Sequence, residues 1–264
     1  MTVQPALSTR QLATRQTRER ILDVAERHFA RLGYYGASLR SITSDAGVQL
    51  ALVHYHFKSK DKLYRAVIAR RVEALTTERI AMLDAGGSRR GKPRLEQVVR
   101  ALVAPTVELC SGEGGGHFYG QMLGQIINNP EERAQEILIE LFDPVAHRFI
   151  AAVRRAAPRL DVAAANWGYY FAVGAMVQAL AKTGRIERLS GGRCESRDAE
   201  TVIDNLTRFI TAGFNALAES DAKVRPQAKN RPAKRQPKKK ARLKVAALTG
   251  NRSAIRSRAG GKAT

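Results

Sequence analysis

The chain has 264 residues, 44% of them hydrophobic, and carries a formal net charge of +21 at pH 7. This length allows one large or two small domains with a real core, and no apolar run approaches the ~18 residues that a membrane span requires. The two cysteines, Cys110 and Cys194, are too few for a disulfide framework or a zinc cluster. Residues 1–14 are predicted to form a flexible basic arm. Residues 1–20 lack the apolar stretch of a secretory signal, and the low cysteine count fits a reducing cytoplasm, where we expect the protein.

Residues 219–264 carry most of the excess positive charge. They contain 15 Lys and Arg residues against two acids, a balance of +13, whereas the rest of the chain has a balance of +8. This tail has no aromatic residue and cannot bury enough surface to offset its ordering entropy, so we predict that it is disordered. Such a tail is expected to attract polyanions, nucleic acid above all, in a salt-sensitive way. The alternative is a solubilising tail without a specific partner.

Between these ends the chain is predicted to be all-α, because apolar residues recur at helical spacing and no segment has a convincing period of two. Gly33 is expected to end the first helix, Ser38 to cap the second, and Gly47 to allow a sharp turn after it. Pro144 is expected to kink a long helix, and residues 184–196 to form a polar loop. The predicted helices cover residues 17–32, 39–46, 50–56, 60–83, 94–109, 117–128, 130–157, 161–183 and 197–218.

Residues 38–57, SLRSITSDAGVQLALVHYHF, form the clearest functional pattern in the chain. They predict two short helices joined by a tight turn at residues 45–48. This arrangement is a helix-turn-helix, which places its second helix in the major groove of DNA. The apolar residues of this unit are expected to lock the second helix against the first two. They are Phe29, Ile42, Val48, Val53 and Phe57.

Residues 17–65 resemble the DNA-binding domain of TetR-type (tetracycline-repressor-like) transcriptional regulators. The resemblance rests on Phe29, Gly33, Ser38, Ile42, Ala46-Gly47-Val48, Tyr55-His56-Phe57, Ser59-Lys60 and Leu63. It implies an all-α homodimer in which residues 15–62 form a three-helix DNA-binding domain and residues 63–218 form a larger helical domain. That larger domain is implied to bind a small effector and to supply the dimer interface. The expected function is a sequence-specific repressor that a small apolar effector releases from its double-stranded DNA operator.

The sequence departs from the family pattern at several positions of the motif. Ser41 stands where an acid often completes a capping box, and Thr43 replaces a small residue. Gln49-Leu50-Ala51 replaces Ser-x-Gly, and His54 replaces an aromatic residue. An operator sequence therefore cannot be transferred from the family.

The outward side of the second helix supplies candidate DNA contacts. Gln49 can pair with adenine, Leu50 and Ala51 can touch a thymine methyl group, and Tyr55 can reach a phosphate. The resemblance implies base or phosphate contacts for His54 and Arg40, and a phosphate contact for Lys60 at a helix N-terminus. For His56, phosphate contact and packing are both open, and a zinc site with His54 lacks further ligands. The full predicted set is Ser38, Arg40, Gln49, Leu50, Ala51, His54, Tyr55, His56 and Lys60.

Several large apolar residues of the second domain are candidates to line an effector cavity. They are Phe118, Met122, Ile126, Phe142, Phe149, Trp167 and Tyr170. The C-terminal half is similar to the fatty-acid-responsive branch of the family, which implies a fatty acid or acyl derivative as effector. Residues 161–183 and 197–218 are expected to form a four-helix bundle with a second copy. The alternative is an ordinary intramolecular core.

Two classes of function are alternatives to a regulator. The basic tail allows an architectural, nucleoid-type DNA-binding protein, in which the tail would supply nearly all of the binding. An enzyme is disfavoured, because no catalytic set is visible and the Gly-rich loop at residues 112–116 lacks the GK[ST] ending of a phosphate-binding loop. No cofactor and no metal ion is expected, and a regulator would associate with the nucleoid.

Overall fold

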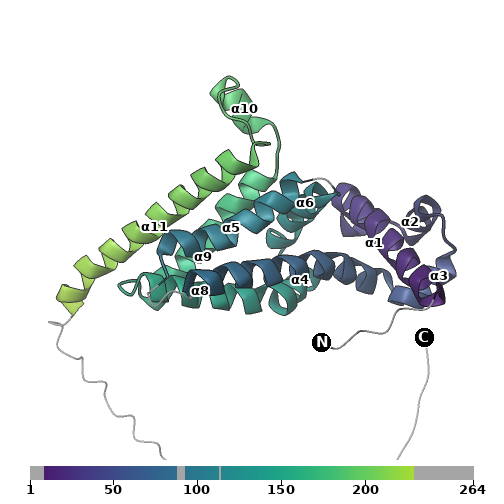
Figure 1. The fold of residues 1–264 in the computed structure, drawn as a ribbon, viewed down its shortest axis with the longest axis horizontal. Coiled ribbons are helices and arrows are strands. Elements are labelled where there is room, and N and C mark those ends of the chain that lie inside the picture. The colour runs from purple at the N-terminus through teal and green to yellow at the C-terminus, as the bar shows by residue number, and fades with distance from the viewer. Residues whose placement is uncertain (1–8, 88–92, 113, 229–264) are drawn as a thin grey trace, which may run out of the picture.

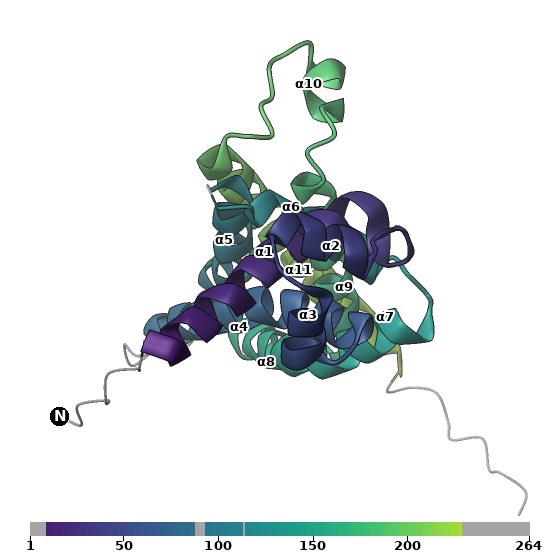
Figure 2. The ribbon, with the colours of Figure 1, turned by 90° about the vertical axis from the view of Figure 1, so that its right-hand side faces the viewer.

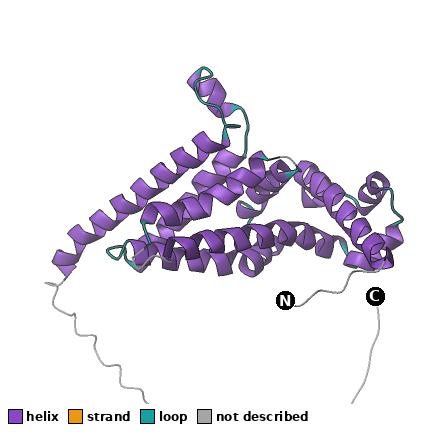
Figure 3. Cartoon of the chain, viewed as in Figure 1, coloured by secondary structure: helices purple, strands orange, loops and turns teal. Residues whose placement is uncertain are grey.

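The computed structural model describes residues 9–87, 93–112 and 114–228, and all regular structure in these ranges is helical (Figures 1 and 3). The predicted all-α fold class is thus confirmed. The N-terminal elements are α1 (Thr9–Gly36), α2 (Leu39–Ala46), α3 (Leu50–Phe57) and α4 (Lys60–Gly87). The remaining elements are α5 (Leu95–Ser111), α6 (Gly116–Ile127), α7 (Glu132–Ile137), the π-helical turn η1 (Leu138–Phe142), α8 (Asp143–Ala156), α9 (Val162–Leu180), α10 (Arg185–Ser190) and α11 (Ala199–Ala228).

The first three helices form a small unit at one end of an elongated molecule (Figure 1). The long helix α4 leaves this unit and runs into a larger helical body, where it packs against α5. Helix α1 packs against both α4 and α6, so the small unit rests directly on the body. Figure 2 looks onto this end, with α2 and α3 facing the viewer. The arrangement leaves α2 and α3 free for an external partner.

The body is built around α5, which is buried along most of its length. Helix α11 crosses α5 and α9, while α8 packs on both of these helices. Helix α10 stands away from the body on an extended loop (Figures 1 and 2). It lies within residues 184–196, where the sequence predicted a loop without structure. Glycines with positive φ, Gly184 (69°) and Gly191 (60°), bound this six-residue helix on either side.

Both terminal helices are longer than predicted. Helix α1 begins at Thr9, so residues 9–14 are helical where a flexible arm was expected, and α11 continues to Ala228 into the predicted disordered tail. In α1, the hydroxyl groups of Thr14 and Thr17 donate to backbone carbonyls four residues earlier, which keeps both side chains compatible with a helix. The remainder of the predicted arm and tail, residues 1–8 and 229–264, lies outside the described residues.

Two predicted helix interruptions are present. Gly33 adopts φ 67° and ψ 178° and breaks the helical path of α1. The predicted kink near Pro144 takes the form of the π turn η1, which separates α7 from α8. Proline lacks an N–H group and clashes with the carbonyl four residues before it, and a wider π turn relieves that clash. The helix that was predicted over residues 130–157 is therefore two helices and a turn.

Candidate DNA interface

The turn between α2 and α3 has the geometry that the sequence predicted. The hydroxyl oxygen of Ser38 caps α2 by accepting from the backbone N–H of Ser41 at 3.0 Å. Gly47 adopts φ 60° and ψ 42°, a left-handed conformation that strains residues with a Cβ atom. The N–H of Val48 then donates to the carbonyl of Thr43 at 3.0 Å, which closes the turn. These contacts hold α3 at a defined angle to α2.

A buried core lies beneath α3. Phe29, Ile42 and Val53 are completely buried, and Phe57 is nearly so, as predicted. Val48 is only half-buried at the edge of this core, because it belongs to the turn rather than to the helix. The core fixes α3 from below, so the opposite side of the helix is free to contact a partner.

The opposite side of α3 presents polar and aromatic groups to solvent. Gln49, Ala51 and His54 are exposed, as are Leu50 and Tyr55, whose exposed fractions are 38% and 65%. The predicted outward orientation of these five residues is confirmed. Ser38 and Arg40 at the start of α2 are also exposed. Contact of all seven residues with DNA stays a prediction.

The two remaining candidates, His56 and Lys60, are half-buried. Burial lowers the pKa of His56, and the charges of Arg18 and Lys58 lower it further, so its imidazole is neutral at pH 7. The Nζ atom of Lys60 donates to the carbonyl of Tyr35 at 3.4 Å. Lys60 therefore faces the last turn of α1, and its side chain must move outward to reach a phosphate.

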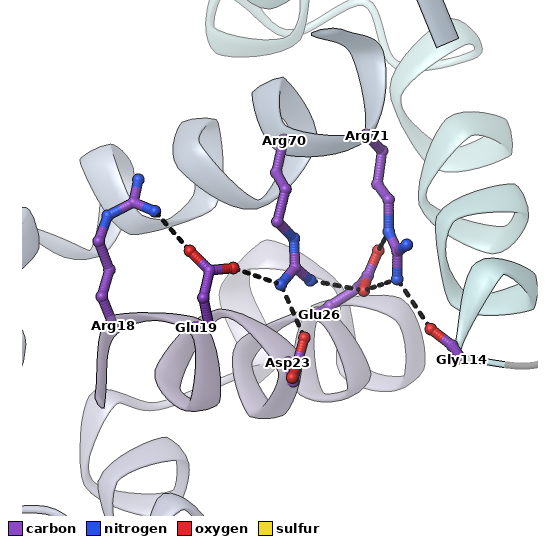
Figure 4. Close-up of polar contacts among 7 residues, drawn as sticks. All are labelled: Arg18, Glu19, Asp23, Glu26, Arg70, Arg71 and Gly114. Carbon is purple, nitrogen blue, oxygen red and sulfur yellow. Dashed lines mark hydrogen bonds and ion pairs between the residues drawn. The ribbon is translucent and has the colours of Figure 1, made fainter. Parts of the chain in front are cut away.

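Glu26 joins the small unit to the body. The sequence did not predict this role. Its carboxylate, 3% exposed, accepts from Arg71 Nε and Nη2 at 2.8 and 2.7 Å and from Arg70 Nη2 at 3.0 Å (Figure 4). Arg71 also donates to the carbonyl of Gly114 at 3.0 Å, in the loop before α6. The signal in the sequence is a carboxylate on the apolar face of α1, one turn after Leu22.

Hydrogen bonding to Glu26 raises the pKa of Arg71. Arg71 remains charged, and the network ties α1, α4 and the α5–α6 loop together through one buried carboxylate. A displacement of α4 or of that loop would therefore pull on α1.

A second junction lies at the C-terminal end of α1, around the break at Gly33. The guanidinium of Arg133, from α7, stacks over the ring of Tyr34 at 3.7 Å. The hydroxyl of Tyr35 donates to Glu131 at 3.1 Å, and Gln125 of α6 donates to the carbonyl of Ala30 at 2.9 Å. Together with the Glu26 network, these contacts connect the small unit to α4, α6 and α7.

The predicted effector residues differ in burial. Met122, Ile126 and Phe149 are buried in the core of the body, whereas Phe118 and Phe142 are half-buried. Phe118 lies at the junction with α1, with the guanidinium of Arg31 5.5 Å from its ring centre. Phe142 lies in another part of the fold, in the π turn η1.

The prediction that Trp167 and Tyr170 line an internal cavity is wrong. Their exposed fractions are 57% and 68%, and they lie on the outer side of α9. The buried side of that helix is formed by small residues such as Gly168 and Ala172. The phase of α9 was misread because the helix is apolar nearly all round.

A groove with a volume of about 730 Å³ opens elsewhere, between the end of α9, the α10 loop and the start of α11. It is lined in part by Lys182, Ile186, Leu189 and Phe209, and includes none of the predicted effector residues. Within the described ranges, no three side chains are grouped to hold a metal ion. In those same ranges no helix is long and apolar enough to cross a membrane.

Comparison with known proteins agrees with this geometry. The first domain matches a family model described as "Bacterial regulatory proteins, tetR family" over residues 21–67. The body matches one described as "Tetracyclin repressor-like, C-terminal domain" over residues 100–213. A similar protein is the HTH-type nicotine-responsive transcriptional repressor HdnoR of Paenarthrobacter nicotinovorans, 31% identical over 117 residues, 44% of this chain. The match spans about half, 51%, of that relative's length.

Two solved structures share the fold. The fatty acid degradation regulator FadR from Bacillus halodurans superposes with a TM-score of 0.57 and 11% identity, over 75% of this chain and 95% of that one. FadR from Bacillus subtilis, solved in complex with stearoyl-CoA, gives a TM-score of 0.54 and 12% identity, over 72% and 97% of the two chains. At these identities the likeness concerns the fold alone. With one family model on each domain, the chain belongs to the TetR family of bacterial regulatory proteins, which are DNA-binding regulators and not enzymes.

Proposed function

We propose that the protein is a homodimeric transcriptional repressor that binds its operator through α3 and releases it when a small apolar effector binds the body. One observation carries this proposal: α3 presents Gln49, His54 and Tyr55 outward over a fully buried core. Polar and aromatic side chains on a rigidly held helix are what direct reading of base edges requires. The domain limits follow as part of the proposal, with residues 15–62 binding DNA and residues 63–218 binding effector and partner.

Dimerisation is supported by an unpartnered apolar surface on α9 and α11. Trp167, Tyr170 and Phe171 form a contiguous aromatic cluster on α9, with ring centroids 5.5–6.2 Å apart. Phe171 and Phe209, on α9 and α11, are 57% and 70% exposed. Exposed apolar patches of this kind mark interaction sites. A second copy of the chain would cover both helices as a four-helix bundle, over residues 161–183 and 197–218.

Release from DNA is supported by the two junctions between the domains. The Glu26 network and the Arg133–Tyr34 stack connect α1 to α4, α6 and α7. An effector that shifts these body helices would change the position of α1, and with it the separation of the two α3 helices in the dimer. The effector then acts by binding more tightly to the arrangement of helices that does not fit the operator than to the one that does.

The proposed effector is an apolar molecule such as a fatty acid or acyl derivative. The body has a large apolar interior that includes Met122, Ile126 and Phe149. The structurally similar FadR of Bacillus subtilis was solved with stearoyl-CoA. Met122, Ile126, Phe149, Phe118 and Phe142 are retained as candidate contacts.

Selection from a random DNA library tests the proposed function. The full chain should enrich a pseudo-palindromic sequence whose half-sites are separated by about one helical turn (~10 base pairs) or slightly more, because a two-fold dimer presents two α3 helices. Sedimentation of the selected complex should show two copies of the chain on one site. Enrichment of no sequence at all would contradict a sequence-specific regulator and favour an architectural DNA-binding protein.

A further inference from the structure

Arg79 of α4 reaches deep into the body. Its Nη2 atom donates to the carbonyl of Leu102 at 3.0 Å and, through a short hydrogen bond, to the hydroxyl of Thr106. Both acceptors lie on α5, which contains Pro105 within the helix. The buried Nε atom of Arg79 has no hydrogen-bond partner.

The proline in α5 does not explain this arrangement. Pro105 lacks an N–H group, so the carbonyl that loses its helical donor is that of Ala101, four residues earlier. Arg79 Nη2 donates instead to the carbonyl of Leu102. The proline therefore accounts for neither the buried free donor Nε nor the positive charge.

No carboxylate balances that charge among the described residues. None of the ion pairs there includes Arg79, in contrast to Arg70 and Arg71 on the same helix, which share Glu26. Glu78 is the carboxylate that influences Arg79 electrostatically, and it is exposed to solvent. A guanidinium stays protonated in proteins, so Arg79 is a deep cation without a counter-charge.

The neighbouring titratable groups are neutral. Burial raises the pKa of Tyr119 and of Tyr169, and it raises the pKa of the Cys110 thiol to about 11. None of the three carries a negative charge at pH 7. Arg79 and Tyr169 are nevertheless not fully closed off, since each keeps part of its surface accessible. A cation with part of its surface accessible thus lies near neutral hydroxyl groups in an otherwise apolar body.

We propose that Arg79 is the counter-ion for the carboxylate of an amphiphilic effector, whose apolar part lies among the body helices and whose head group meets Nε of Arg79. Thr106, which accepts from Nη2 of Arg79, borders this head-group site, and Tyr119 and Tyr169 lie close enough to influence Arg79 electrostatically. The inference rests on the proposed function, because it assigns the chemical class of that effector. A charged group is favoured there since it supplies the charge that the protein leaves unbalanced.

The test compares decanoate and hexadecanoate with the uncharged alcohols of the same chain lengths, by calorimetry on the full chain. The wild-type protein should bind each acid at least about tenfold more tightly than its alcohol. Arg79→Met should bind acid and alcohol equally, since only the charge preference is lost. Arg100→Met is the matched control, because Arg100 forms an ion pair with Asp204 at 2.7 Å and both side chains are about half exposed. It should keep the preference.

Thermal melting separates this role from a structural one. If Arg79 only secures the proline-containing helix, Arg79→Met should melt lower and keep the wild-type ratio of acid to alcohol binding, which would overturn the proposal. Wild-type protein that binds no carboxylate would overturn it equally. The proposal would also be overturned if the affinity for stearoyl-CoA, whose anionic groups are phosphates, depended on Arg79 while the affinity for the acids did not.

Binding to the selected DNA distinguishes this inference from the proposed function. Without ligand, the wild-type protein, Arg79→Met and Arg100→Met should bind that DNA alike, and decanoate should release it from Arg79→Met only at a concentration at least about tenfold higher than from the other two. Loss of carboxylate selectivity with intact DNA binding refutes the Arg79 site alone. Absence of DNA binding in the wild type refutes the regulator, whatever the calorimetry shows.

Discussion

Replacing Glu26 with alanine should lower the free energy of unfolding by about 3–5 kcal/mol, the largest loss we expect from any single polar substitution. The substitution leaves Arg70 and Arg71 partly buried without the carboxylate that accepts three of their N–H groups. Because α1 and α4 are joined through this carboxylate, the DNA-binding unit should also detach from the body. Urea denaturation followed by circular dichroism measures the loss directly.

Asp23→Ala is the matched control for this experiment. Asp23 contacts Arg70 at 2.7 Å in the same network, but its side chain is 58% exposed, so its removal should cost less than about 1 kcal/mol (Figure 4). Equal effects of the two substitutions would show that burial of Glu26 does not dominate the network. An unchanged free energy of unfolding for Glu26→Ala would contradict the proposed connection between the domains.

Phe171→Asp should convert the dimer into monomers and reduce operator affinity by about 100-fold or more. An aromatic residue at the centre of an interface contributes roughly 2–4 kcal/mol, and each 1.4 kcal/mol corresponds to about a factor of ten in dissociation constant. The new carboxylate would be buried against the partner without a counter-ion, which adds to the loss. Analytical ultracentrifugation gives the oligomeric state, and fluorescence anisotropy with the selected DNA gives the affinity.

Ile139→Asp serves as the control for surface charge. Ile139 is 64% exposed on η1, outside the α9–α11 surface, so its substitution should leave the dimer and the DNA affinity unchanged. A dimeric Phe171→Asp protein would place the interface elsewhere than on α9 and α11. A monomeric protein with undiminished operator affinity would contradict the two-fold mode of binding.

The small N-terminal unit could be predicted from sequence, except for the two ends of α1. Its signals are local: a serine N-cap, a glycine in the left-handed region and apolar residues at helical spacing each act within one or two turns. Helix α2 begins and ends where predicted, and α3 differs from its prediction by one residue. The outward orientation of His54 followed from the same spacing, because the buried Val53 fixes the phase of the helix. Gln49 is exposed because it precedes the helix as its extended N-cap residue.

The body was harder to predict, because its helices are positioned by contacts between distant residues. In α9, apolar side chains occur on every side, so the sequence does not distinguish the inner face from the outer one. Trp167 and Tyr170 were consequently assigned to a cavity, although they are exposed. Glu26 and Arg79 were missed because their significance depends on what each meets in another helix.

The exposed side of α3 is proposed to read the operator. Measuring affinities for all single-base variants of the selected DNA, with Gln49→Ala and Lys60→Ala beside the wild type, tests this claim most directly. Gln49→Ala should lose about 1–3 kcal/mol of discrimination at one defined position in each half-site and keep it elsewhere. Lys60→Ala should weaken all sequences alike, as loss of a phosphate contact does. Identical profiles for the two variants would contradict the assignment of α3 as the reading helix.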